Sequence, residues 1–555
     1  MRLTHVEVQG WRSVRNISFP VGNITALVGA NNAGKSSILQ ALNFLLGPTY
    51  PQQRYLEDGD FFGRSRENGM TIKVHLEGGT DLASMYFTVA GEAGGDSGLR
   101  RQYQPGGKPY PLNGDVRETV PLIYIDADRS FDRHFGTSKW ALFGQAIRHL
   151  ERHFKDHVGA EDKAAIEENL GRAHLLLETD LYKSFVGAVG KAFEEQLRHT
   201  RYSVGVNFKS FDPMSFYRGL QPFLTEDDAT KSLHETGSGL RNLLVLALFR
   251  AFGQTFRSDA IVAIEEPELY LHPHAQRGLM RMFREIAANG TQILYSTHSS
   301  AFVSVENFDE VVLVDRCSDE GEGDDIPCTQ VRHLDGDELV RRHERNRPGE
   351  TFLLSGIRER YRHNCGPEHT EAFFGRLVVL VEGATEAVAL PIYAEKMGQN
   401  FDALGISVVN ARGKDNIESL HHLYEGMGFL VYAVFDNDVG MPSNGARDRE
   451  KKALSNRRLT KLLTGTEADW PPGLVSSAYA ILEGDFEKVI KAEIGELESG
   501  LYERLSNEAG EIYGSSSKPI AARYIADYMC TLGCVPPTIE RIINSIVLLE
   551  SGLLR

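Results

Sequence analysis

The chain has 555 residues, and 60 Lys and Arg against 76 Asp and Glu give a formal net charge of −16. This length suggests about three to five domains, and the acidic balance excludes nucleic-acid binding by the overall field, so any such site must be a local basic patch. Charged residues make up 25% and hydrophobic residues 41%, as in a folded globular protein rather than a disordered or collagen-like one.

Cysteine use and hydropathy exclude further classes. Five cysteines in this length are not a disulfide framework, and Cys530 and Cys534 lack the partners of a zinc site. No apolar run is long enough to predict a membrane span. The first residues lack a basic and then apolar signal segment, so the sequence predicts a cytoplasmic protein.

The first third of the chain alternates between strand and helix patterns. Period-two alternation or short apolar runs predict strands at 3–8, 24–28, 71–76, 85–89 and 121–126. The many glycines and prolines of 91–114 predict a loop. Apolar residues at three- and four-residue spacing predict a helical insertion over 140–199.

Further strands are expected at 203–208 and 260–264, and the acidic segment 318–325 is expected to be a surface loop.

A phosphate-binding loop follows the strand at 24–28. Residues 29–36 read GANNAGKS and match the pattern G-x-x-x-x-G-K-[ST] in full, and a helical pattern follows. Glycines let backbone N–H groups wrap phosphates at a helix N-terminus, while Lys35 would reach the β- and γ-phosphates and Ser36 would bind Mg²⁺. The predicted ATP contacts are Gly29, Asn31, Asn32, Gly34, Lys35, Ser36 and Ser37.

Two later strands end in residues that suit ATP hydrolysis. The strand at 261–264 ends in Glu265, predicted to hold Mg²⁺, and Glu266, predicted to orient the attacking water. His298 follows the strand at 292–295 and is predicted to bond a γ-phosphate. Ser238 and Gly239 precede an apolar helix, where free N–H groups would contact a nucleotide across a dimer.

Acidic residues follow two predicted strands of the second half. The apolar run 377–381 leads to Glu382 and Glu386, and the run 430–435 leads to Asp436 and Asp438. Residues two apart on an extended segment point to one side, and four converging carboxylates would repel one another without cations between them. We therefore predict a Mg²⁺ or Mn²⁺ site, with two ions that clamp a phosphodiester.

The first half resembles the ATP-binding-cassette ATPases of the chromosome-maintenance and DNA-repair type. The resemblance rests on the loop 29–36, Ser238-Gly239, Glu265-Glu266, Leu271-His272-Pro273 and His298. It also covers Trp11-Arg12-Ser13 and implies that Arg12 lies near the nucleotide. Glu265 stands where the family has Asp, and the absence of sustained heptads between Lys35 and Glu265 excludes a long coiled-coil arm.

The second half resembles a Toprim domain through 377–386, Gly413-Lys414 and 435–438. An ATPase followed by Toprim is similar to the overcoming-lysogenization-defect (OLD) family of nucleases. That resemblance implies a further Glu and a Lys near the C-terminus. Glu487 is the preferred match for the Glu, with Glu483 as the alternative, and Lys518 matches the Lys that would stabilise charge on the scissile phosphate.

Residues 447–461 form a basic stretch, with seven basic residues and two acidic ones. In an acidic protein such a stretch is where a phosphate backbone would bind, and a solvated charged helix is the alternative. The predicted DNA contacts are Lys414, Arg447, Arg449, Lys451, Lys452, Arg457 and Arg458.

The sequence thus predicts an α/β protein in four parts. They are the N-terminal part of an ABC-type P-loop ATPase (1–139), a helical insertion for dimerisation (140–200), the C-terminal part of the ATPase (201–360), and a Rossmann-like Toprim nuclease domain with a C-terminal helical region (371–555).

The predicted function is an ATP-regulated, divalent-metal-dependent DNA endonuclease that forms a homodimer or higher oligomer. The OLD resemblance implies bacterial antiphage defence, alone or with a helicase, a retron reverse transcriptase with its DNA, or another defence subunit. One alternative is a non-nucleolytic DNA-binding ATPase of repair or recombination. The other is a Toprim nucleotidyl-transfer or strand-passage enzyme, although neither a nucleophilic Tyr domain nor a zinc-binding Cys set is identifiable.

Overall fold

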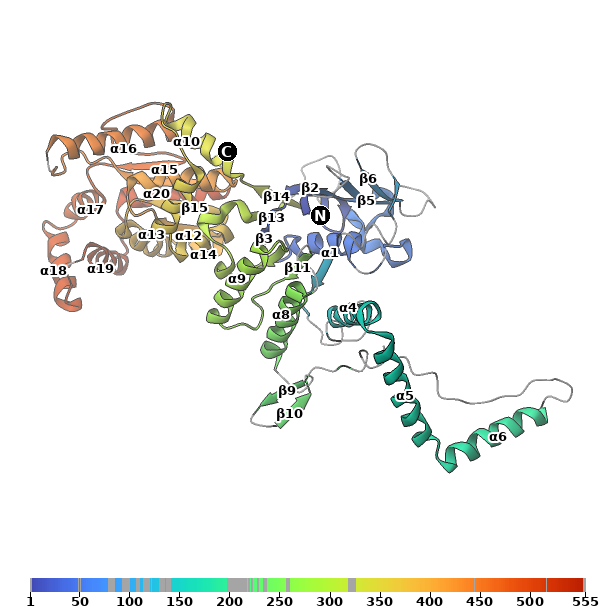
Figure 1. Ribbon diagram of the computed structural model, residues 1–555. Coiled ribbons are helices and arrows are strands. Elements are labelled where there is room, and N and C mark those ends of the chain that lie inside the picture. The colour runs from blue at the N-terminus through green and yellow to red at the C-terminus, as the bar shows by residue number, and fades with distance from the viewer. Residues whose placement is uncertain are drawn as a thin grey trace.

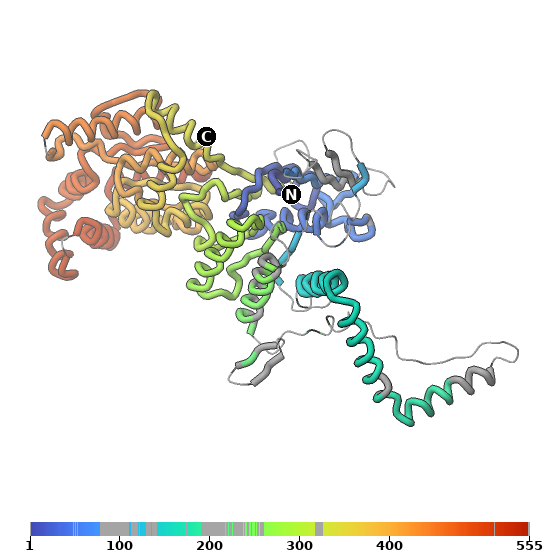
Figure 2. The backbone as a smooth tube through the Cα atoms, in the orientation of Figure 1, coloured from blue at the N-terminus to red at the C-terminus, as the bar shows by residue number. Residues whose placement is uncertain are grey.

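A computed structural model shows a central body, a second α/β unit beside it and a projecting helical arm (Figures 1 and 2). The structure describes residues 2–552 except 48, 50, 78–84, 92–99, 106–109, 113–119, 121, 129–134, 136–140, 197–216, 218–219, 221–222, 227–228, 233–236, 256–259, 318–325, 444 and 516. The strand expected at 203–208 and the loop expected at 318–325 lie outside the described residues.

A six-stranded sheet forms the centre of the N-terminal body, in the order β14-β13-β3-β12-β11-β8. Its strands are β3 (Ile24–Val28), β8 (Leu122–Ile125), β11 (Ile261–Glu265), β12 (Gln292–Thr297), β13 (Val311–Cys317) and β14 (Cys328–His333). All pairs are parallel except β13 with β14. Every residue of β3, β11 and β12 is buried, as expected for parallel strands covered on both faces.

An antiparallel sheet covers part of one side, in the order β2-β1-β4-β5-β6-β7. Its strands are β1 (Arg2–Trp11), β2 (Val14–Pro20), β4 (Met70–Glu77), β5 (Met85–Gly91), β6 (Arg100–Pro105) and β7 (Tyr110–Pro111). Helix α1 (Lys35–Leu46) lies between the two sheets in one apolar core, and α8 (Ser238–Thr255) and α9 (Pro273–Ala288) cover the opposite face. The prediction of a loop throughout 91–114 is wrong, because β6 pairs with β5 there.

Three helices form the arm that extends from the body (Figure 1). They are α4 (Leu142–His157), α5 (Ala160–Leu177) and α6 (Asp180–Gln196), and they fall within the predicted helical insertion. Helix α4 packs against α8, whereas α5 and α6 are largely exposed. A short hairpin, β9 (Phe223–Glu226) and β10 (Ala229–Ser232), lies near the base of α8.

The second unit is a five-stranded sheet in the order β16-β15-β17-β19-β18, parallel except for β18. Its strands are β15 (Leu377–Val381), β16 (Ile406–Asn410), β17 (Leu430–Asp436), β18 (Leu474–Val475) and β19 (Tyr479–Leu482). Its helices are α12 (Pro367–Glu371), α13 (Ala384–Lys396), α14 (Phe401–Leu404), α15 (Lys414–Gly426), α16 (Ala446–Thr464), α17 (Phe486–Gly495), α18 (Leu501–Tyr513), α19 (Lys518–Thr531) and α20 (Pro537–Glu550). Helices α13, α17, α19 and α20 share an apolar core on one face, and α15 packs on the other.

The two units are joined by one continuous apolar core. Helices α10 (Gly336–Asn346) and α11 (Leu354–Asn364) follow β14, and Leu339 and Ile357 belong to the same cluster as Val378 of β15. Helix α10 lies in the part predicted as ATPase, yet it packs against α15 and α16 of the second unit. In the described part of the chain, no helix is long and apolar enough to cross a membrane.

Candidate ATP and metal sites

The loop between β3 and α1 is arranged around Lys35. The ammonium group of Lys35 donates hydrogen bonds to the main-chain oxygens of Gly29 (2.9 Å) and Ala30 (2.8 Å). Burial lowers the pKa of Lys35 to about 8, although Glu266 and Glu268 oppose that shift. The loop thus presents a desolvated cation at the N-terminus of α1, where an anionic phosphate would bind.

Two glycines of this loop are required by close backbone approach. A Cβ on Gly29 would lie 1.9 Å from the oxygen of Val314, and one on Gly34 would lie 2.1 Å from Oγ1 of Thr329. Gly34 also has φ of 111°, which strains other residues. Thr329 donates a 2.9 Å hydrogen bond to the oxygen of Ala33, so β14 is fixed to the loop.

The carboxylate of Glu265 lies at the end of β11 and is held by two neighbours. Tyr124 donates a 2.5 Å hydrogen bond to Oε1, and Gln40 of α1 donates a longer one of 3.4 Å. Arg12 donates a hydrogen bond to the side-chain oxygen of Gln40 and forms an ion pair with Asp60 at 2.9 Å. Sequence reasoning missed both neighbours of Glu265: Tyr124 reaches Glu265 because β8 pairs with β11, and Gln40 reaches it because α1 packs against β11.

Glu266 and His298 face each other across the ends of β11 and β12. His298 Nε2 lies 3.8 Å from Oε1 of Glu266, and burial together with Lys35 lowers the pKa of His298. Glu268 accepts hydrogen bonds from the main-chain nitrogen of His298 (2.6 Å) and from Thr297 (2.8 Å). Glu268 therefore fixes the position of the segment that contains Thr297 and His298.

Ser238 and Gly239 begin helix α8, as the sequence predicted for a helix start. A Cβ on Gly239 would lie 3.0 Å from the oxygen of Tyr270, which belongs to the segment that follows Glu266. Glu235 and Thr236 lie outside the described residues.

Three acidic side chains meet at the ends of β15 and β17. The main-chain nitrogen of Asp436 donates a 3.2 Å hydrogen bond to Glu382 Oε2, and Glu386 is buried in the first turn of α13. Burial, with Glu382 and Glu386 adding to it, raises the pKa of Asp436 to about 9. Burial also raises the pKa of Glu386 to about 7 and that of Glu382 above its usual value. Each of these shifts favours the neutral form of the carboxyl group.

Asp438 is oriented differently from the prediction. Strand β17 ends at Asp436, and Asp438 has φ of 59°, so the premise of an extended segment is wrong. Lys414 contacts its carboxylate, and Lys452 lies 3.3 Å from it. Lys414 is buried and lies 3.9 Å from Glu382, so it belongs to the acidic site and not to an open DNA surface.

A second group of charged side chains comes from the starts of helices α17 and α19. Lys518 Nζ lies 3.1 Å from Glu487 and 3.8 Å from Asp485, and Thr385 donates a 3.3 Å hydrogen bond to Glu487. Asp485 caps α17 and helps to raise the pKa of Asp436. Sequence reasoning passed over Asp485, although a carboxylate just before a helix is a typical N-cap.

Glu483, the alternative ligand, is exposed beside Gly473. The geometry therefore favours Glu487.

The basic stretch forms most of α16, and several of its charges are paired. Arg457 pairs with Glu450 and Asp469, and Arg458 pairs with Glu350. A DNA phosphate would have to compete with these carboxylates for the guanidinium groups of Arg457 and Arg458. The exposed basic residues are Arg447, Arg449, which lies 5.5 Å over the ring of Trp470, and Lys451.

The acidic site fits divalent metal ions. Oδ1 of Asp436 is buried and has no hydrogen-bond partner among the described residues, a state that is costly for a polar atom. The surrounding donors are carboxylate oxygens, which suit Mg²⁺ or Mn²⁺. Glu382, Glu386 and Asp436 would hold the ions, with Glu487 and Asp485 close by.

Comparison with known proteins agrees with this arrangement. Residues 24–304, half of the chain, match the family described as AAA domain, putative AbiEii toxin, Type IV TA system. Residues 373–438 match the overcoming lysogenization defect protein-like TOPRIM domain. The chain thus belongs to the class in which an AAA-type P-loop ATPase domain precedes a TOPRIM domain.

Relatives that carry nuclease names align with more than half of the chain. The OLD nuclease of Thermus scotoductus is 28% identical over 81% of this chain and 84% of its own. The Old nuclease of Escherichia phage P2 is 22% identical over 96% of both chains. Endonuclease GajA of Bacillus cereus is 20% identical over 56% of this chain and 59% of its own.

Among solved structures, an SMC head bound to the C-terminal winged-helix domain of ScpA aligns with 60% of this chain and 98% of its own, at 15% identity and a TM-score of 0.38. The chain therefore carries an AAA-type ATPase domain followed by an OLD-like TOPRIM domain, and it is similar over most of its length to proteins named OLD nuclease. The predicted family and α/β fold class are confirmed.

Proposed function

We propose that the protein is a DNA endonuclease whose divalent metal ions are held by Glu382, Glu386 and Asp436, and that ATP bound at 29–36 regulates it. Oδ1 of Asp436, which is buried and has no hydrogen-bond partner in the described part of the chain, carries this proposal. The pKa values of these three carboxyl groups are raised, and a bound cation would favour their ionised forms. The match to the OLD-like TOPRIM domain supports a phosphodiester as the substrate.

The metal ions and the side chains of the protein would have different roles in cleavage. Bound divalent ions would supply Lewis-acid stabilisation of the phosphodiester oxygens. The side chain of Lys518 is 65% exposed and lies beside Glu487, so it can reach a substrate phosphate and offset developing charge. Lys414 and Lys452 hold the carboxylate of Asp438 at the rim of the site.

A chain of contacts supports regulation by ATP. Thr329 of β14 bonds the phosphate loop through Ala33. Helix α10 follows β14 and packs against α15, whose first residue, Lys414, enters the acidic site. A shift of the loop on nucleotide binding would therefore reach Lys414 through two helices and one strand.

A second copy of the chain is the proposed partner in assembly. Leu176, Leu181 and Phe185 are exposed on α5 and α6, at 83%, 80% and 59%. Apolar exposure of this extent on a projecting arm favours a protein interface. The Ser238-Gly239 helix start would then contact a nucleotide of the other copy. The defence role and any helicase, retron or other defence partner are proposed only from the family resemblance.

The experiment is plasmid cleavage with Mg²⁺ or Mn²⁺, measured beside phosphate release from ATP. Wild type should cleave, Asp436→Ala should lose cleavage and keep ATP hydrolysis, and Glu266→Gln should lose hydrolysis. Undiminished cleavage by Asp436→Ala would show that the assigned site is wrong. DNA binding with no cleavage by wild type would favour the non-nucleolytic ATPase.

A further inference from the structure

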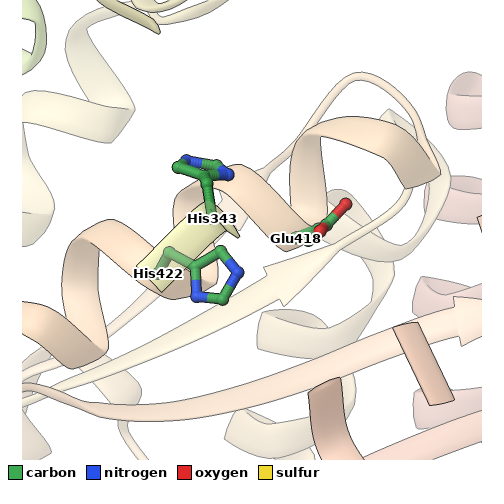
Figure 3. A group of neighbouring side chains, drawn as sticks. All are labelled: His343, Glu418 and His422. Atoms are coloured by element: carbon green, nitrogen blue, oxygen red, sulfur yellow. The ribbon is translucent and has the colours of Figure 1, made fainter. Parts of the chain in front are cut away.

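Three buried side chains, none of which belongs to the ATP loop or to the acidic site, gather where the two units meet. His343 comes from α10, and Glu418 and His422 come from α15; they are 1%, 1% and 4% exposed (Figure 3). One potential ligand atom from each lies within 4.8 Å of those of the other two.

The spacing on α15 suits a shared ligand. Glu418 and His422 are four residues apart in a helix, so their side chains lie on one face, and α10 places His343 against that face. Two ligands at positions i and i+4 of a helix, with a third from another element, is an arrangement that zinc sites use.

One ring nitrogen of each histidine has no hydrogen-bond partner in the part of the chain that the structure describes. Nδ1 of His343 and Nε2 of His422 are buried, and neither has a hydrogen-bond partner among the described residues. Buried polar atoms are usually satisfied, and each orphan costs about 1–3 kcal/mol. Two imidazoles with such nitrogens, in one cluster with a buried carboxylate, point to a ligand that accepts electron pairs.

Glu418 is held by two residues of the α10 segment. Arg347 donates to it through Nε at 2.9 Å, and Asn346 donates at 2.7 Å. These bonds alone would explain a buried ion pair, but they leave Nδ1 of His343 and Nε2 of His422 without a partner in the described part of the chain. Such outer contacts also orient a carboxylate that binds metal.

We propose that His343, Glu418 and His422 form a binding site for Zn²⁺ or a similar borderline transition-metal ion. Imidazole nitrogen with one carboxylate suits such ions better than Mg²⁺. Bonds of about 2.0–2.2 Å in tetrahedral geometry require the ligand atoms to close to roughly 3.4 Å, which small side-chain rotations provide. The ion ties α10 to α15, across the joint between the ATPase and TOPRIM units.

The test is the zinc content of the full-length protein, after Zn²⁺ loading and extensive dialysis, measured by elemental analysis. Wild type should keep one equivalent that His343→Gln and His422→Gln each lose. His421→Gln is the matched control, because His421 is also buried on α15 but lies outside the cluster. Asp436→Asn should keep the equivalent, which separates this site from the acidic one.

Co²⁺ provides a second readout that does not depend on activity. Co²⁺-loaded wild type and His421→Gln should show visible absorption from a low-coordinate site, and the two ligand variants should lose it. Circular dichroism checks folding, and one folded ligand variant suffices for the comparison. Equal zinc content in a folded ligand variant and His421→Gln would overturn the proposal, as would folded wild type that keeps no zinc.

Discussion

The main-chain nitrogen of Asp436 donates a hydrogen bond to the side chain of Glu382, at 3.2 Å. This bond joins the ends of β17 and β15, which are neighbours in the sheet. It fixes the Glu382 carboxylate next to that of Asp436, although 54 residues separate them in the chain. The first prediction follows from burial and from the repulsion between the carboxylates of Glu382 and Asp436, which together raise the pKa of Asp436.

Asp436→Asn should abolish the stabilisation of the protein by Mn²⁺. In wild type, a ligand that binds only the folded state at a hundred times its Kd adds about 2.7 kcal/mol, seen as a higher Tm. The metal-free variant should be at least as stable as wild type, because an amide removes a carboxyl group that resists ionisation. Thermal unfolding with and without Mn²⁺ measures both effects.

Asp402→Asn is the control, because Asp402 is exposed on α14. An equal Mn²⁺ shift in Asp436→Asn and in this control would exclude Asp436 as a ligand.

Glu266→Gln should bind ATP like wild type and hydrolyse it at least about a hundredfold more slowly, since a positioned base contributes 10²–10⁴ in rate. The amide keeps the size of the side chain, which lies 3.8 Å from His298, but cannot accept a proton. Nucleotide binding by fluorescence and phosphate release measure the two properties. Glu395→Gln, on the exposed face of α13, is the control, and hydrolysis by Glu266→Gln at its rate would refute the assignment.

Lys518→Ala should cut DNA about a hundredfold more slowly and still bind Mn²⁺, because its proposed partner is the substrate phosphate. Lys518 also neutralises Glu487 at 3.1 Å, so metal affinity should change by a few-fold only. Plasmid cleavage and the Mn²⁺ thermal shift are measured on the same preparation. Lys396→Ala, an exposed lysine at the end of α13, should match wild type. A loss of metal binding together with cleavage would make Lys518 a structural partner of the acidic site.

Replacing Arg447 and Lys451 with Ala should weaken DNA binding and reduce its salt dependence, since the slope of affinity against salt counts neutralised phosphates. Both residues are exposed on α16. Arg458→Ala is the contrast, because its guanidinium already pairs with Glu350, and it should bind like wild type. Binding isotherms at several salt concentrations decide between them. Equal losses in both variants would contradict the assignment based on ion pairing.

Leu181→Asp with Phe185→Asp should convert a dimer into monomers, because a charge placed in an apolar interface is strongly desolvated. Both side chains are exposed on α6, so the fold of the isolated chain should not change. Light scattering measures the mass with and without a non-hydrolysable ATP analogue. Lys183→Glu is the control on the same helix. A wild-type monomer in both conditions would contradict the proposed assembly.

Local patterns were sufficient for much of the fold, and they also led to the predicted ATP site. The apolar runs 24–28 and 377–381 coincide with β3 and β15, because a strand buried on both faces reads as a continuous apolar run. The loop at 29–36 carries its chemistry in consecutive residues. Glu382, Glu386 and Asp436 were found because parallel strands place their carboxyl ends along one edge of a sheet.

Contacts between distant segments decided the rest. Lys414 follows a glycine with φ of 121° and enters the acidic site, and no local pattern shows that direction. Tyr124 reaches Glu265 only because β8 pairs with β11. His343 meets Glu418 because α10 packs across α15. Periodicity and motifs are properties of neighbours in the chain, whereas the direction, burial and partner of a side chain depend on which elements pack together.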